Sequence, residues 1–151
     1  MLGISYMYRF ECIGNLQDIE QAIFHHQRAV ESTPSGHVDL LGWLFNCGNS
    51  YCRCFQHTGN LWDIEHAISD YKRAIESTPS GHANLPDLFN NLGNSYCLYF
   101  KHTGNVQDVE HAISDFKKAI ESTPSGHAKL SDLFDGLGNS YSLYFGCTGN
   151  L

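Results

Sequence analysis

The fold of this chain is decided by the stretch GNLWDIEHAISDYKRAIESTPSGH, residues 59–82, because this stretch recurs. A second copy begins at Gly104 and a more divergent copy at Gly14, each 45 residues from its neighbour. The units that begin at Gly59 and Gly104 are identical at 33 of 45 positions. A fixed period of this length is typical of solenoids and other repeat arrays. We therefore read residues 1–151 as a single repeat domain, with a partial repeat at 1–13 and full repeats at 14–58, 59–103 and 104–148.

Each full repeat opens with a helix-start signal. An Asn is followed three residues later by an acid, which resembles a capping box; the pairs are Asn15 with Asp18, Asn60 with Asp63, and Asn105 with Asp108. Apolar residues then recur at steps of three and four, which predicts an amphipathic helix from about Leu61 to Ser77 in the middle copy. Among these apolar positions the first copy departs at one, where His26 stands in place of Tyr71 and Phe116.

The segment ESTPSGH ends this helix in every repeat, because Pro cannot continue a helix and Gly allows a sharp turn. A second helix is expected from Leu85 to about His102, with Pro86 in its first turn, where a missing N–H is tolerated. The last helix is expected from Leu130 to Cys147. Each repeat is thus a helical hairpin, and the fold class is all-α with about seven helices.

Gly48, Gly93 and Gly138 interrupt the second helix, where Gly costs about 1 kcal/mol relative to Ala. A Gly in every copy indicates close packing against another helix. We expect the opposing residues to be Ala22, Ala67 and Ala112.

These residues together resemble the tetratricopeptide repeat. The pattern runs from the repeat 59–103 into the repeat 104–148, as Phe89-x-x-Leu92-Gly93-x-x-Tyr96, then Ala112-x-x-x-Phe116, then Pro124. The repeat is longer than the standard 34 residues and is similar to the long subtype of kinesin light chains and of fungal NLR-like and CHAT-associated arrays. The resemblance implies an α-solenoid of antiparallel helix hairpins, a right-handed superhelix whose concave groove is lined by the first helix of each hairpin.

Composition and charge argue against several classes of function. Nine Lys and Arg against sixteen Asp and Glu give a net charge of −7, which argues against nucleic-acid binding. No apolar run approaches the length of a membrane span, and the first ten residues do not resemble a secretory signal. We expect a cytoplasmic protein with reduced cysteines.

The nine histidines do not predict a metal site, because most recur by the repeat period, and packed helices lie about 8–10 Å apart. Hydrogen bonding at helix ends accounts better for these loop histidines. The sequence contains no nucleophile elbow and no phosphate-binding Gly loop. We therefore predict no catalytic, cofactor-binding or metal-binding residue, and no enzyme.

The resemblance implies a peptide-binding groove. Its predicted lining residues are Phe45, Asn49 and Arg53 in one repeat, Asp87, Asn90 and Asn94 in the next, and Asp132, Asp135 and Asn139 in the last. The three equivalent amides, Asn49, Asn94 and Asn139, either bind a ligand backbone or satisfy neighbouring helix carbonyls.

Chaperone-binding members of the family use groove Lys and Arg to clamp a C-terminal carboxylate. The matching positions here are Phe45, Asn90 and Asp135, so we expect no binding of an acidic C-terminal peptide. The groove carboxylates favour a neutral or basic ligand instead.

Both ends of the array are expected to be open, since residues 1–13 match only the end of a repeat and the last helix has no partner after it. Open solenoid ends favour association. Two functions follow: a non-catalytic protein-protein interaction scaffold, or a structural, self-associating part of a longer array in a multidomain signalling protein.

Overall fold

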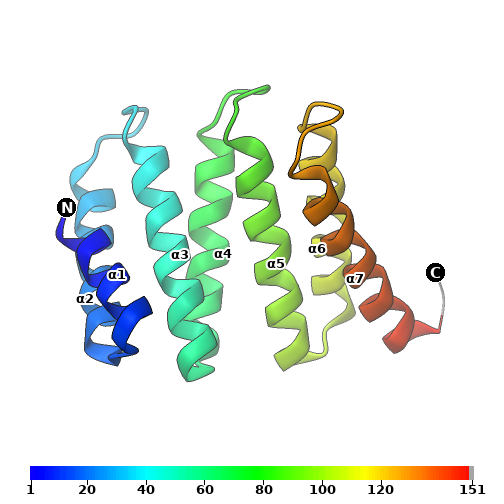
Figure 1. The fold of residues 1–151 in the computed structure, drawn as a ribbon, viewed down its shortest axis with the longest axis horizontal. Coiled ribbons are helices and arrows are strands. Elements are labelled where there is room, and N and C mark those ends of the chain that lie inside the picture. Colours follow the sequence, from blue (N-terminus) through cyan, green and yellow to red (C-terminus); the bar gives the residue numbers. More distant parts are fainter. Residues whose placement is uncertain (150–151) are drawn as a thin grey trace. The chain divides into compact units, whose positions relative to one another are not determined.

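The structure is a computed structural model that describes residues 1–149. Within that range the chain forms seven α-helices and no strand (Figure 1). The helices are α1 (Leu2–Ile13), α2 (Leu16–Ser32), α3 (Leu40–Thr58), α4 (Leu61–Glu76), α5 (Leu85–Thr103), α6 (Val106–Glu121) and α7 (Leu130–Thr148). The predicted bounds for the middle and last copies are confirmed to within one residue.

The chain divides into two compact units, residues 1–77 and residues 78–151. In the first unit α1 packs on α2, α2 on α3, and α3 on α4. In the second unit α5 packs on α6 and α6 on α7, and α5 also touches α7. Consecutive helices run in opposite directions within each unit (Figure 1). The all-α fold of antiparallel helix pairs is therefore confirmed.

The predicted helix starts are observed at α2, α4 and α6. The side chains of Asn15, Asn60 and Asn105 accept hydrogen bonds from the backbone N–H two residues later, at 3.0, 3.2 and 3.1 Å. The Gly before each Asn adopts the left-handed conformation, with φ near 71° at Gly59, and ends the preceding helix. This geometry fixes the tight turn between successive helices.

The acids of the expected capping boxes bind other groups. Asp108 accepts a hydrogen bond from Thr103 Oγ1 at 3.1 Å, and the same Oγ1 accepts from the N–H of Asn105 at 3.3 Å. A Thr hydroxyl thus lies between the acid and the N-cap N–H, a geometry that suits Asp because its side chain is one methylene shorter than the Glu of a capping box. In α2 the acid, Asp18, forms a bidentate pair with Arg9 of α1.

The helical glycines lie against aromatic rings, which corrects the expectation that they oppose Ala22, Ala67 and Ala112. A Cβ on Gly48 would lie 2.8 Å from Tyr71 Cε1, and a Cβ on Gly93 would lie 3.0 Å from Phe116 Cε2. The ring is the nearest group because the aromatic side chain, four residues after the Ala, extends across the helix contact. A Cβ on Gly138, by contrast, would have no atom of the described residues within 4 Å.

Each unit has a core of these ring contacts and aliphatic side chains. In residues 1–77 the fully buried positions include Ile19, Leu44, Tyr51, Ile64 and Tyr71. In residues 78–149 they include Leu88, Val109 and Phe116. Ala67 and Ala112 are fully buried as well, as small residues at a close helix contact should be.

Candidate functional site

A hollow of about 690 Å³ lies between α5 and α7 in the second unit. Five of the six groove residues predicted for this unit line it: Asn90, Asn94, Asp132, Asp135 and Asn139. The helical periodicity explains the coincidence, because residues three and four apart share one side of a helix. The structure therefore brings these five side chains to one concavity.

The hollow is polar and acidic. Its lining holds three amides, the Ser142 hydroxyl and two carboxylates, with no Lys or Arg among the described lining residues. Asp132, Asp135 and Asn139 are exposed to solvent. Such a surface offers hydrogen bonds in both directions to a peptide backbone and attracts a cationic side chain through its carboxylates.

Four lining residues lie outside the nine groove residues named from the sequence, namely Phe134, Gly136, Gly138 and Ser142. Gly136 stands where the earlier repeats have Asn46 and Asn91, and this break in the repeat was the available signal. A Cβ on Gly136 would meet Phe116 Cε1 at 2.4 Å, so the ring of Phe116 is held between Gly93 and Gly136.

Asp87 is the sixth predicted residue of this unit, and it does not line the hollow. Its two carboxylate oxygens each lie 2.7 Å from Lys129 Nζ, at the start of α7. Both side chains are exposed, so the pair contributes little to stability. It does neutralise a carboxylate that would otherwise add to the acidity of the groove.

The three groove residues predicted on α3 have contacts inside the first unit. Phe45 packs edge-to-face on Tyr71, with ring centroids 6.3 Å apart. Arg53 lies 3.9 Å from the carboxylate of Glu11 and 3.3 Å from Gln56 Oε1. The three residues are spaced by four and therefore lie on one side of α3.

The three equivalent Asn side chains, Asn49, Asn94 and Asn139, have different environments. Asn49 Oδ1 accepts a hydrogen bond from the Tyr71 hydroxyl at 2.6 Å. Phe116, which replaces Tyr71 in the next copy, has no hydroxyl, and Asn94 Nδ2 instead lies 3.5 Å from Asn90 Oδ1. Asn49 therefore has a structural bond to a neighbouring helix, whereas Asn94 and Asn139 present their amides to the hollow.

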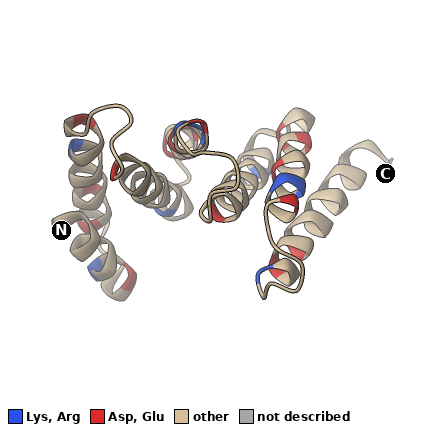
Figure 2. Ribbon diagram, turned by 90° about the horizontal axis from the view of Figure 1, so that it is seen from above, with Lys and Arg blue, Asp and Glu red and all other residues tan. Residues whose placement is uncertain are grey.

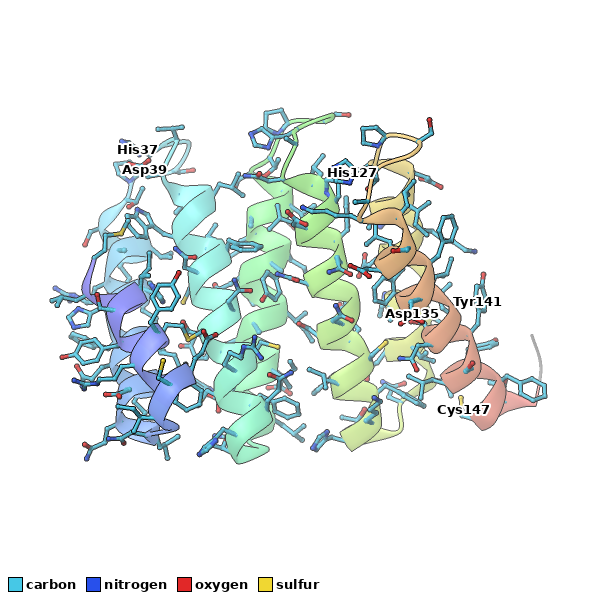
Figure 3. The ribbon with its side chains drawn as sticks, in the orientation of Figure 1. His37, Asp39, His127, Asp135, Tyr141 and Cys147 are labelled. Atoms are coloured by element: carbon cyan, nitrogen blue, oxygen red, sulfur yellow. The ribbon has the colours of Figure 1, made fainter. Side chains whose placement is uncertain are left out.

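The loop histidines bond to helix starts, as predicted. Nδ1 of His37, His82 and His127 accepts from the backbone N–H two residues later, at 3.2, 3.2 and 3.1 Å. Figure 3 shows His37 and Asp39 together in the loop before α3, and His127 in the loop before α7. Within residues 1–149 no group of three His, Cys, Asp or Glu side chains is arranged to hold a metal ion.

The buried cysteines are poor nucleophiles. Burial, with Asp70 nearby, raises the pKa of Cys47 far above its ordinary value, and burial with Asp63 nearby raises the pKa of Cys54 to about 12. Cys97 is also buried, 3.3 Å from Ser140 Oγ. Since the thiolate is the reactive form, these three thiols are unsuited to covalent catalysis at neutral pH.

Comparison with known proteins adds no family: no protein-family model matches the chain, and no curated protein matches it. None of the helices in residues 1–149 is both long enough and apolar enough to cross a membrane.

Proposed function

We propose that the chain is a non-catalytic scaffold of the tetratricopeptide type, which binds an extended peptide segment in the hollow between α5 and α7. The observation that carries this proposal is the hollow itself, which is lined by the amides of Asn90, Asn94 and Asn139 together with two carboxylates. Helix hairpins with the Ala-x-x-x-aromatic and Leu-Gly spacing of that repeat class support the assignment.

The ligand is a neutral or basic protein segment. Amides can pair with the N–H and C=O groups of an extended backbone without regard to its sequence. Asp132 and Asp135 then select for a Lys or Arg side chain and against an acidic one. No nucleic-acid, membrane or cofactor interaction is proposed, and the acidic balance of the chain is suited to a cytoplasmic protein partner.

A panel of fluorescent 12-residue peptides tests this function, with basic, neutral and acidic members that differ only in their charged residues. We expect saturable anisotropy changes with the basic and neutral peptides and none with the acidic ones. The double variant Asn94→Ala/Asn139→Ala should lose binding. The control Gln107→Ala removes an exposed amide of α6 outside the hollow and should bind like the parent.

Equal binding by the parent and the Asn94→Ala/Asn139→Ala variant would overturn the proposal, provided that circular dichroism shows both chains to be equally helical. Preference for the acidic peptides would overturn the ligand class.

A second candidate function is structural self-association of the array. Exposed aromatic side chains on α7, Phe134 and Phe145, favour it, because they are 56% and 51% exposed. Sedimentation velocity distinguishes the two functions. A chain that stays monomeric over a roughly 100-fold range of concentration favours the scaffold function. An oligomer that forms as concentration rises, and that also forms in the Asn94→Ala/Asn139→Ala variant, supports self-association.

A further inference from the structure

One side of α7 is apolar and lies open within the described part of the chain. Phe134, Gly138, Tyr141 and Phe145, here called the α7 seat, are spaced by four, three and four residues and so share one side of the helix. Apart from Asp132 and Asp135, α7 has no charged residue, and the second half of this helix is tan throughout in Figure 2. Figure 3 shows Asp135 and Tyr141 on different sides of α7.

The earlier copy of this face shows what it is built to contact. The equivalents of the α7 seat on α3 are Leu44, Gly48, Tyr51 and Phe55. Leu44, Tyr51 and Phe55 are 0%, 1% and 2% exposed, because α4 packs over them. The same type of face on α5 packs on α6. Two of the three aromatic side chains of the α7 seat are more than half exposed, so the contact that α2, α4 and α6 each make with the preceding helix is not made at α7 by any residue of 1–149.

The covering helices place an aromatic ring on the glycine. Tyr71 of α4 lies against Gly48, and Phe116 of α6 lies against Gly93, in each case so close that a Cβ would meet the ring at 3.0 Å or less. Gly138 is the third glycine of this series, and no atom of residues 1–149 occupies the corresponding space. The space beside Gly138 therefore matches the space that an aromatic ring fills beside Gly48 and Gly93.

Two further contacts define the covering helix. His66 of α4 packs on Tyr51 with ring centroids 5.1 Å apart, and His111 of α6 stacks on Tyr96 at 5.0 Å. Lys118 of α6 lies over the ring of Phe89, 5.7 Å from its centroid. Tyr141 and Phe134 occupy the positions of Tyr96 and Phe89. Lys117 of α6 lies over the Tyr141 ring, 5.7 Å from its centroid, so a covering helix would stack on the side of that ring away from α6.

We propose that the α7 seat binds an amphipathic helix with the pattern His-Ala-x-x-x-(Phe or Tyr)-x-(Lys or Arg). The aromatic residue packs on Gly138, the Ala allows close approach, the His stacks on Tyr141, and the cation lies over Phe134. This pattern is shared by α4 and α6, where it reads His66-Ala67, Tyr71 and Arg73, and His111-Ala112, Phe116 and Lys118. The site extends beyond the peptide hollow, although Phe134 and Gly138 border both surfaces.

A labelled peptide of residues 104–123 provides the probe, since it contains the α6 helix with its N-cap. Short helices are marginal in water, so a lactam joins Glu110 to a Lys introduced by Ser114→Lys, two exposed positions four residues apart. We expect saturable binding of this peptide to the full chain by fluorescence anisotropy. The peptide variant Phe116→Ala should bind at least about tenfold more weakly, because it lacks the ring.

Variants of the chain locate the contact. Gly138→Ala meets no atom in the free chain, so it should fold at least as well as the parent, yet its Cβ blocks the ring and should weaken peptide binding about tenfold. The matched control is Gly146→Ala, on the same helix and also in open space, which should leave binding unchanged.

Equal affinity of the parent and Gly138→Ala, or no saturation with the stapled peptide, would overturn the proposal. Loss of peptide binding in Asn94→Ala/Asn139→Ala would also overturn it, because the peptide would then occupy the hollow. A chain that dimerises unless Gly138→Ala is present, and binds no peptide, would identify a second copy as the occupant instead.

Discussion

His26 Nδ1 lies 2.9 Å from the Ser50 hydroxyl, in the buried contact between α2 and α3. The other ring nitrogen, Nε2, is buried without a hydrogen-bond partner among the described residues. A Cβ on Gly3 would lie 2.6 Å from this nitrogen, so the imidazole is enclosed by the backbone of α1. His26 thus fills the position of the Tyr71 and Phe116 rings with a group that can gain a charge.

The first prediction concerns stability at acidic pH. Burial, with a contribution from His25, lowers the pKa of His26 in the folded chain below its ordinary value of about 6.5. Between these two pKa values the unfolded chain binds more protons, so the free energy of unfolding falls as pH drops below about 6.5. The loss is at most about 1.4 kcal/mol per pH unit. Urea titrations followed by circular dichroism from pH 8 to pH 5 measure it.

His26→Phe should remove this contribution, because Phe116 shows that a phenyl ring fits the equivalent position. The Ser50 hydroxyl keeps its bond to the Asn46 carbonyl, at 3.0 Å. Gln107→Ala is the control, since Gln107 is exposed and has no titratable side chain, so the slope should stay that of the parent. Identical pH slopes for the parent and His26→Phe would show that His26 does not determine the acid sensitivity.

The second prediction concerns the Tyr71–Asn49 hydrogen bond. Tyr71→Phe deletes the hydroxyl and preserves the ring over Gly48, so it should lower the free energy of unfolding by about 1 kcal/mol. Asn49→Ala should cost a similar amount, and the double variant should cost less than the sum of the two. A double-mutant cycle measures this coupling at about 0.5–1.5 kcal/mol. Strictly additive effects would mean that the bond contributes nothing in solution.

The helices and their pairing could be predicted from the sequence because the signals are local. Asn15, Asn60 and Asn105 cap helices with bonds to residues two positions away, and the Gly and Pro residues end helices through backbone geometry alone. The side of each helix that faces the hollow also follows from periodicity. Five predicted lining residues of the second unit therefore lie together.

The remaining features depend on side chains that reach across helix contacts. Spacing alone placed Ala residues opposite the helical glycines, whereas the longer Tyr71 and Phe116 rings fill that space. Equivalent Asn residues were expected to act alike, but a single hydroxyl on α4, 22 residues away, engages Asn49. Such differences lie in three-dimensional contacts between non-neighbouring residues and have no periodic signal.

The third prediction compares how Ala substitutions at Gly136 and Gly138 of α7 change the free energy of unfolding. Gly136→Ala should destabilise the chain, because its Cβ would lie 2.4 Å from the Phe116 ring and overpacking costs about 1–3 kcal/mol. The gain in helix propensity, about 1 kcal/mol, offsets part of that cost. Gly138→Ala meets no atom and should be stabilising by up to about 1 kcal/mol. Urea unfolding measures both, and a stabilising Gly136→Ala would contradict the ring contact.

The fourth prediction concerns the charge of the ligand. The positions at which chaperone-binding tetratricopeptide proteins have cations are occupied by Phe45, Asn90 and Asp135, and two of these line the acidic hollow. A peptide with a free acidic C-terminus brings like charge to Asp132 and Asp135, and repulsion opposes its approach. Isothermal titration calorimetry should detect no binding at peptide concentrations of about 1 mM. The double variant Asn90→Lys/Asp135→Lys reverses the local charge and should gain measurable affinity for the same peptide. Micromolar binding by the parent chain would show that the hollow accepts an acidic terminus and that its carboxylates do not select the ligand.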